Sequence, residues 1–225
     1  MQTTGQALLW SNGQKWVLGV VLAAWFAFAS FIGIGEILAN THSSIFPPVA
    51  ITVVIPVTLF LAFYAISSRF RRFILSQDIK FLTMMQLWRV IGFTFLPLYA
   101  YGVLPGLFGW VAGVGDVAVG LFAILVVSRL YQNPDYVMSK SFRWFHYFGM
   151  LDFIGALATA ALSSGAVPAL VFNGVTSGPL DVWPLNLFPS FIVPCFIIMH
   201  LCVLLQVRHL AQNHNVSQIT STVSG

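Results

Sequence analysis

Residues Lys80–Tyr131 read KFLTMMQLWRVIGFTFLPLYAYGVLPGLFGWVAGVGDVAVGLFAILVVSRLY, and this stretch decides the fold. It holds two apolar runs, joined by a short Pro/Gly-rich turn, each long enough to cross a hydrocarbon core of about 30 Å. Each run carries one charge well inside it, Arg89 in the first and Asp116 in the second. Charges inside lipid-spanning segments are costly, so they usually face a partner, a cavity or a functional site. The stretch therefore predicts a membrane-embedded helical hairpin with buried polar groups.

The composition of the whole chain excludes a soluble fold. Hydrophobic residues make up 58% of the 225 positions and charged residues only 7%, whereas a soluble domain carries roughly 25% charged residues. The lipid bilayer must therefore be the solvent of this chain. We expect an all-α, polytopic bundle, because helices hydrogen-bond their own backbone N–H and C=O groups where lipid cannot. The net charge of +4 lies in short loops between apolar runs. We read it as a topology signal, so the expected partner is the lipid bilayer and not nucleic acid.

The apolar runs divide the chain into an N-terminal tail over residues 1–15, a six-helix transmembrane domain over 16–208 and a tail over 209–225. The predicted spans are 16–39, 46–67, 81–101, 110–127, 144–162 and 187–207. Lysine and arginine gather in the loops after the second and fourth spans, and the other three links carry none. The positive-inside rule then places both termini and both basic loops in the cytoplasm.

The depth of each polar side chain can be estimated from a rise of about 1.5 Å per residue. Arg89 then lies roughly 13 Å from the inner boundary, with Asp152 at the same depth and Asp116 roughly 10 Å below the outer boundary. Arg89 is long enough to reach either aspartate. We expect one buried polar cluster, a candidate substrate or proton site, formed by Gln86, Arg89, Asp116, Asp152 and His200.

One arginine facing two aspartates leaves an excess of one negative charge. Either His200 is protonated or one aspartate is neutral, and groups of this kind are candidate proton carriers. The alternative is that a buried Arg–Asp pair only fastens helices, at about 1 kcal/mol for each interhelical polar contact. Glu36 ends the first span and is predicted at the outer rim of the membrane domain.

The sequence gives little sign of a cofactor. No HExxH-type metal-ligand spacing occurs, so no metal site is predicted. A haem ligated by two histidines would have to use His200 with His146, and the latter is predicted close to the inner interface. Cys195 and Cys202 are two helical turns apart on one span, too far for a disulfide within that helix.

Several short motifs resemble those of an uncharacterised family of bacterial six-span membrane proteins. The resemblance covers roughly residues 80–205 and implies the fold and a cytoplasmic (inner) membrane location, with no activity attached. It also places the five residues of the predicted cluster on motif positions. The motifs are Gln86-x-x-Arg89-x-x-Gly92, Leu104-Pro105, Gly113-x-Gly115-Asp116-x-x-Val119-Gly120, Leu151-Asp152, Pro189-x-Phe191-x-Val193-Pro194 and His200-Leu201.

Three functions remain open at this level. The first is a transporter of a small solute or ion, with proton coupling. The second is a membrane-embedded enzyme, or a protein that binds a lipid, quinone, haem or other cofactor. The third is an interaction subunit without chemistry, in a homo-oligomer or a membrane complex.

Overall fold

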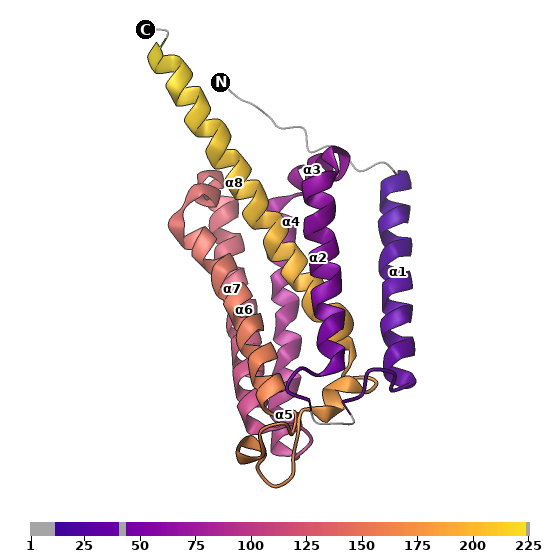
Figure 1. The fold of residues 1–225 in the computed structure, drawn as a ribbon. Coiled ribbons are helices and arrows are strands. Elements are labelled where there is room, and N and C mark those ends of the chain that lie inside the picture. Colours follow the sequence, from indigo (N-terminus) through magenta and orange to yellow (C-terminus); the bar gives the residue numbers. More distant parts are fainter. Residues whose placement is uncertain (1–11, 41–43, 224–225) are drawn as a thin grey trace.

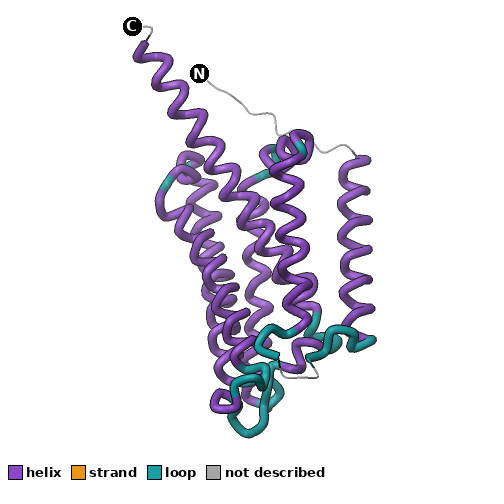
Figure 2. Tube along the Cα trace, viewed as in Figure 1, coloured by secondary structure: helices purple, strands orange, loops and turns teal. Residues whose placement is uncertain are grey.

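The computed structural model describes residues 12–40 and 44–223 of the chain, and helices are the regular secondary structure of this part (Figures 1 and 2). Residues 1–11, most of the predicted N-terminal tail, lie outside the described residues. Within these described residues, six helical segments are long and apolar enough to cross a membrane, which confirms the predicted all-α, six-span fold class. These segments are Lys15–Ile34, Pro48–Ile66, Ile79–Ala100, Gly106–Gln132, Lys140–Leu162 and Phe188–Asn213.

The six spans are built from long helices and from shorter helical pieces that meet end to end. The α-helices are α1 (Asn12–Ile34), α2 (Ile51–Ile66), α3 (Ser68–Leu75), α4 (Ile79–Met84), α5 (Phe95–Ala100), α6 (Gly106–Gln132), α7 (Lys140–Leu162) and α8 (Val193–Val223). A short α3 links the second and third spans, and α8 continues past the bundle, to Val223 (Figure 1).

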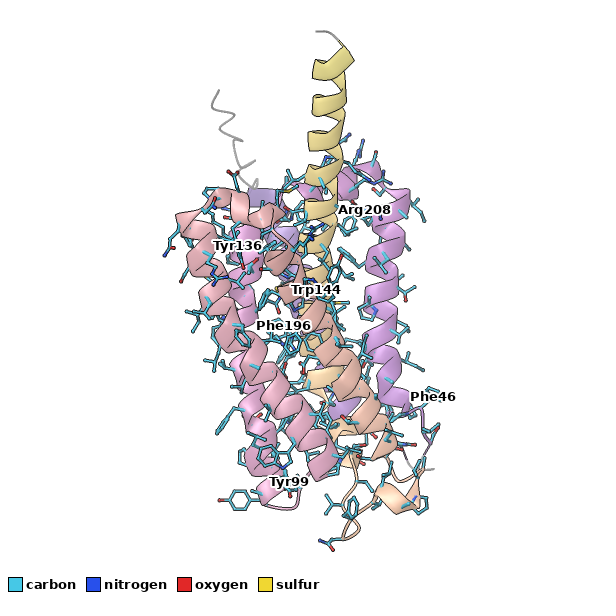
Figure 3. All side chains as sticks on the ribbon, turned by 90° about the vertical axis from the view of Figure 1, so that its left-hand side faces the viewer. Phe46, Tyr99, Tyr136, Trp144, Phe196 and Arg208 are labelled. Carbon is cyan, nitrogen blue, oxygen red and sulfur yellow. The ribbon has the colours of Figure 1, made fainter. Side chains whose placement is uncertain are left out.

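The bundle has two distinct ends. We call the end that carries α3 and the α6–α7 link the basic end, because these loops hold the lysines and arginines between spans. Figure 3 shows Tyr136 and Arg208 at this end, and Phe46 and Tyr99 at the opposite end. The opposite end is closed by the α5–α6 turn and by the long loop over residues 163–187.

The outer surface of the bundle is apolar. Phe31, Ile66 and Leu151 expose 66%, 85% and 62% of their surface, although a soluble protein would rarely expose so many large apolar side chains together. Buried positions instead include arginine, histidine and glutamine. This distribution is that of a multi-pass membrane protein whose solvent is the lipid bilayer.

The third span is not a continuous α-helix. Between α4 and α5 the chain forms a 3₁₀ segment over Met85–Thr94. A 3₁₀-helix has three residues per turn, so residues three apart lie directly above one another. The buried residues of this span follow that period and form one inward face: Thr83, Gln86, Arg89, Gly92 and Phe95. The 3₁₀ geometry thus presents a polar strip to α6, α7 and α8.

The last span begins with a π-helical turn over Phe188–Ile192 that leads into α8. Pro194 has no N–H, so it leaves the carbonyl of Ser190 without its helical donor. The indole Nε1–H of Trp25 donates to that carbonyl at 2.8 Å, and the Trp25 ring meets Phe191 edge to face. Both contacts tie α1 to the bundle.

Candidate functional site

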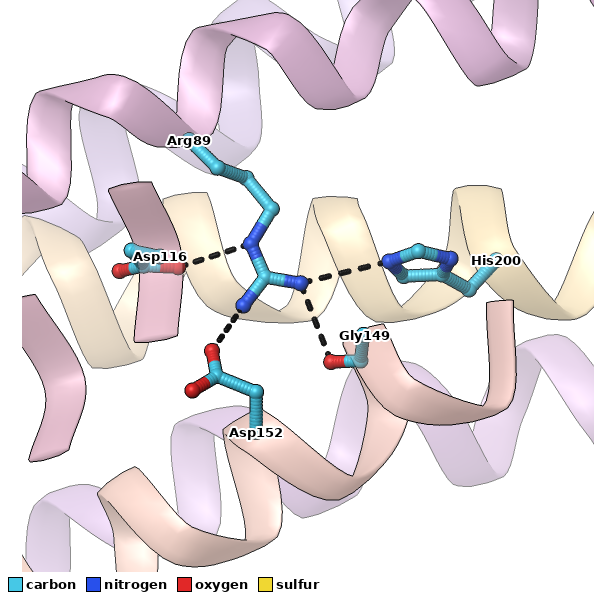
Figure 4. A network of polar contacts seen from close by, with 5 residues as sticks. All are labelled: Arg89, Asp116, Gly149, Asp152 and His200. Atoms are coloured by element: carbon cyan, nitrogen blue, oxygen red, sulfur yellow. Dashed lines mark hydrogen bonds and ion pairs between the residues drawn. The ribbon is translucent and has the colours of Figure 1, made fainter. Parts of the chain in front are cut away.

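Arg89 lies at the centre of a polar network in the bundle interior, with its side chain completely buried (Figure 4). Its Nε donates to Oδ1 of Asp116 at 2.8 Å, and its second terminal nitrogen forms an ion pair with Oδ2 of Asp152. The first terminal nitrogen donates to the carbonyl oxygen of Gly149 at 3.0 Å and faces Nε2 of His200 at 3.3 Å. One planar guanidinium thereby joins the third span to α6, α7 and α8, a role that suits its fixed fork of donors.

A phenyl ring completes the surroundings of the guanidinium. The central carbon of the Arg89 guanidinium lies 3.8 Å from the ring centroid of Phe153. The face of an aromatic ring is electronegative and attracts a cation, most strongly where water is excluded. The site therefore stabilises a positive charge with an aromatic face as well as with carboxylates.

Three glycines give the network the space that it occupies. A Cβ atom on any of them would overlap a side chain from a neighbouring helix. The pairs are Gly92 with Asp116, Gly115 with Asp152, and Gly149 with His200. Gly92 and Gly115, which belong to the sequence motifs, and Gly149, which does not, therefore leave the space that these polar side chains occupy.

Each aspartate keeps one oxygen free. Asp116 binds Arg89 through Oδ1 and Asp152 through Oδ2, and the other two oxygens have no hydrogen-bond partner among the described residues. The two side chains expose 13% and 7% of their surface, whereas Arg89 exposes none. The Arg89 side chain is inaccessible to solvent, but the two carboxylates can still accept a proton or a hydrogen bond.

Two histidines extend the network toward the basic end. Arg89 can only donate, so Nε2 of His200 must accept and its proton must be on Nδ1. That Nδ1–H lies 2.8 Å from Nδ1 of His146 and donates to it. His146 then carries its proton on Nε2, which is buried without a partner in the described part of the chain. In this arrangement both imidazoles are neutral, so the network keeps one negative charge in excess.

The structure brings four of the sequence-predicted residues together and leaves two outside the network. Arg89, Asp116, Asp152 and His200 contact one another through the guanidinium (Figure 4). Gln86 is completely buried one 3₁₀ turn from Arg89, but neither of its amide atoms has a partner within the described residues. Glu36 is exposed in the turn after α1, with a positive φ of 52°.

His146 joins the network through His200, although the sequence placed it close to the inner interface. The predicted span began at residue 144, which put this histidine near the interface. In the structure α7 begins at Lys140, because Oγ of Ser139 accepts the N–H of Phe142 and caps the helix. His146 therefore lies about 6 Å farther from the start of its helix than from the start of the predicted span, at 1.5 Å per residue. The serine cap was the sequence signal for this shift.

The histidine pair does not fit ligation of a haem by both rings. Nδ1 of His146 and Nδ1 of His200 are in direct hydrogen-bond contact, so an iron atom has no space between them. The pair serves instead as a link in a hydrogen-bond chain.

A cavity lies on each side of the network. The first has a volume of about 290 Å³ and lies toward the opposite end, where Asp116 forms part of its wall. The second, of about 320 Å³, lies at the basic end, between Asp78, Lys80 and Gln206. The side-chain nitrogen of Gln206 is buried without a partner among the residues described. Asp116 thus borders the first cavity and Gln206 the second.

Residues 46–208 match the family described as a domain of unknown function, DUF8737. The match spans most of the chain, so the chain belongs to this family. The matched segment contains all the residues of the Arg89 network and begins after α1. Neither the comparison with curated proteins nor that with solved structures gives a match.

Proposed function

We propose that this DUF8737 protein is a transporter that moves a small solute or ion and exchanges it for a proton held by the Arg89 network. The observation that carries the proposal is that two aspartates share one arginine while both histidines are neutral. The excess negative charge of this network is buried in the bundle interior, and a buried charge without a counter-charge is energetically costly. A proton or a cation removes the imbalance, so we assign Asp116 and Asp152 as the carriers and Arg89 as their fixed counter-charge.

The buried polar groups toward the basic end support a proton route on that side. His200 and His146 form a continuous hydrogen-bond chain from Arg89. Gln86, one 3₁₀ turn from Arg89, and Gln206, in the wall of the cavity at the basic end, are also buried with amide atoms that have no partner in the part of the chain described. Such groups are normally satisfied by internal water. We assign His200 and Gln86 as the gate between the carriers and the cavity at the basic end.

We also propose that the basic end faces the cytoplasm. The positive-inside rule supports this orientation, since the basic loops follow the second and fourth spans. The membrane domain would then cover residues 16–208, with both tails, 1–15 and 209–225, on the cytoplasmic side. The family resemblance of the motifs favours the inner membrane of a bacterium.

The test is solute-dependent proton movement in proteoliposomes. The purified protein is reconstituted with the pH dye pyranine inside, and cationic, anionic, zwitterionic and uncharged small solutes are added outside one class at a time. At least one class should change the internal pH, and Asp152→Asn should abolish that change while the protein still inserts. If the wild-type protein and Asp152→Asn give the same response to all four classes, the proposal is wrong.

A further inference from the structure

The cavity beside Asp116 is built mainly from apolar and aromatic side chains. Its volume of about 290 Å³ is close to the lower limit of small-molecule pockets. At about 30 Å³ for a water-sized group, it holds roughly ten such groups. The aromatic part of its lining comes from three spans and from the residues that lead into α2 and α8: Phe46, Phe95, Phe108, Phe153 and Phe188.

The polar part of the cavity selects the charge of a ligand. Among the described residues that line it, Asp116 and Asp181 are the ionisable ones. Asp116 retains a free carboxylate oxygen, which can accept a hydrogen bond or attract a cation. An ionised carboxylate offers no donor to a carbonyl ligand, and it repels an anion. The Arg89 guanidinium lies over the face of Phe153, and phenyl faces in general attract cations where water is excluded.

The cavity is accessible from the surface of the bundle. Its rim includes Phe46 and Val54, which expose 80% and 60% of their surface on the apolar exterior. A ligand with an apolar body can therefore reach Asp116 from the bilayer side of α2.

We infer that this cavity binds an amphipathic organic monocation, with its apolar body among the phenylalanines and its positive head at Asp116, in exchange for the proton of the network. The inference deepens the proposed function by naming its substrate class. The network has one negative charge in excess, which one monocation or one proton neutralises. Both together would leave a buried positive charge, so the two compete.

Other charged or titratable groups around Asp116 belong to several elements. Arg89 faces it from the third span and Asp152 from α7, with His200 from α8 on the far side of the guanidinium. Asp181, in the loop before the last span, lies at the outer part of the same cavity. The lining contributed by α2 and the turn before it is apolar.

The experiment measures binding of benzyltrimethylammonium to the full chain in lipid nanodiscs by isothermal titration calorimetry. N,N-dimethylbenzamide, uncharged and of similar size, is the control ligand. The wild-type protein should bind the cation at least tenfold more tightly than the amide. Its affinity should fall as the pH is lowered, by up to tenfold per pH unit where the network takes up its proton.

Three variants complete the design. Asp116→Asn removes the excess charge and should weaken cation binding at least tenfold. Ala156→Phe fills the cavity without changing its charge, so it should also abolish binding and keeps the test valid if the first variant misfolds. Asp135→Asn, the same substitution at an exposed position of the α6–α7 link, should bind the cation as the wild type does.

The inference is overturned if the amide binds as tightly as the cation, if Asp116→Asn binds unchanged, or if binding is independent of pH. The binding assay needs no proton or solute gradient, so its result is independent of the result of the transport assay. Cation binding without any proton movement in proteoliposomes would refute the transporter but keep the site. Proton-coupled movement of another solute class without cation binding would refute the site alone.

Discussion

Replacing Arg89 by methionine should destabilise the protein more than any change to its partners. The substitution keeps an unbranched apolar stem but leaves the carboxylates of Asp116 and Asp152 buried without a counter-charge. Breaking a buried ion pair by removing one partner costs about 3–5 kcal/mol. The variant also loses the hydrogen bond to Gly149 and the contact with the Phe153 ring, which is worth about 2 kcal/mol when desolvated. We therefore expect a loss of at least 3–5 kcal/mol in the free energy of unfolding.

The same reasoning predicts a rescue. Arg89→Met/Asp116→Leu/Asp152→Leu has no buried charge left in the network, and replacing a whole buried ionic group by apolar residues of similar volume is often nearly neutral. The triple variant should therefore recover most of the loss, and Arg89→Met/Asp152→Leu should be intermediate because one carboxylate remains.

The assay is reversible unfolding in mixed dodecylmaltoside and dodecyl sulfate micelles, followed by the fluorescence of the seven tryptophans. Size-exclusion chromatography checks that each variant is monodisperse before unfolding. If the single and triple variants are equally stable, the unpaired buried carboxylates are not the cause of the destabilisation in Arg89→Met.

Three smaller perturbations test other parts of the structure in the same assay. Gly115→Ala places a methyl group against the Asp152 carboxylate and should cost about 1–3 kcal/mol; an unchanged midpoint would contradict the packing. Burial raises the pKa of Asp181 from 3.8 to about 6, against the opposing donation from the Asn40 N–H. The folded state therefore binds this proton more readily, and the resulting stabilisation, complete below about pH 4, disappears as the pH rises through about 6. Asp181→Asn should remove this part of the pH dependence of stability. If the variant and the wild type lose stability over the same pH range, Asp181 is not the group responsible. Trp25→Phe removes the hydrogen bond to the Ser190 carbonyl and should lower the free energy of unfolding by about 1 kcal/mol. Unchanged stability would mean that other contacts hold α1 against the bundle.

The fold class could be predicted from length and composition alone. Apolar runs of about twenty residues with few charges admit few structures other than spanning helices, because lipid offers the backbone no hydrogen bonds. The equal depth estimated for Arg89 and Asp152 agrees with the ion pair between them, since both estimates rest on the same helical rise.

The 3₁₀ segment could not be found by assuming α-helical geometry throughout. The period of three was present in the sequence as Thr83, Gln86, Arg89, Gly92 and Phe95. An α-helix would distribute these side chains around its surface, whereas a 3₁₀-helix stacks them on one face. Its rise of about 2.0 Å instead of 1.5 Å per residue also shifts Arg89 by about 2 Å along the span. This shift and the long arginine side chain let Asp116 pair directly with Arg89, although the sequence placed it higher.

The histidine pair depended on a helix start that the apolar pattern does not show. Residues 140–143 are polar or charged apart from Phe142, so the pattern assigned them to a loop. The cap at Ser139 overrides that pattern and extends α7 toward the basic end. A hydropathy window weighs apolarity and misses such caps, so the sequence pattern places His146 close to the inner interface.

The most direct test of the central claim, that the Arg89 network holds one exchangeable negative charge, is infrared difference spectroscopy of the protein during a pH titration. A protonated carboxyl group has a C=O stretch that separates it from a carboxylate. We expect one such band. It should appear as the pH is lowered, disappear on addition of benzyltrimethylammonium at constant pH, and be altered or lost in both Asp116→Asn and Asp152→Asn but not in Asp135→Asn. A spectrum in which neither substitution in the network changes any carboxyl band would contradict it.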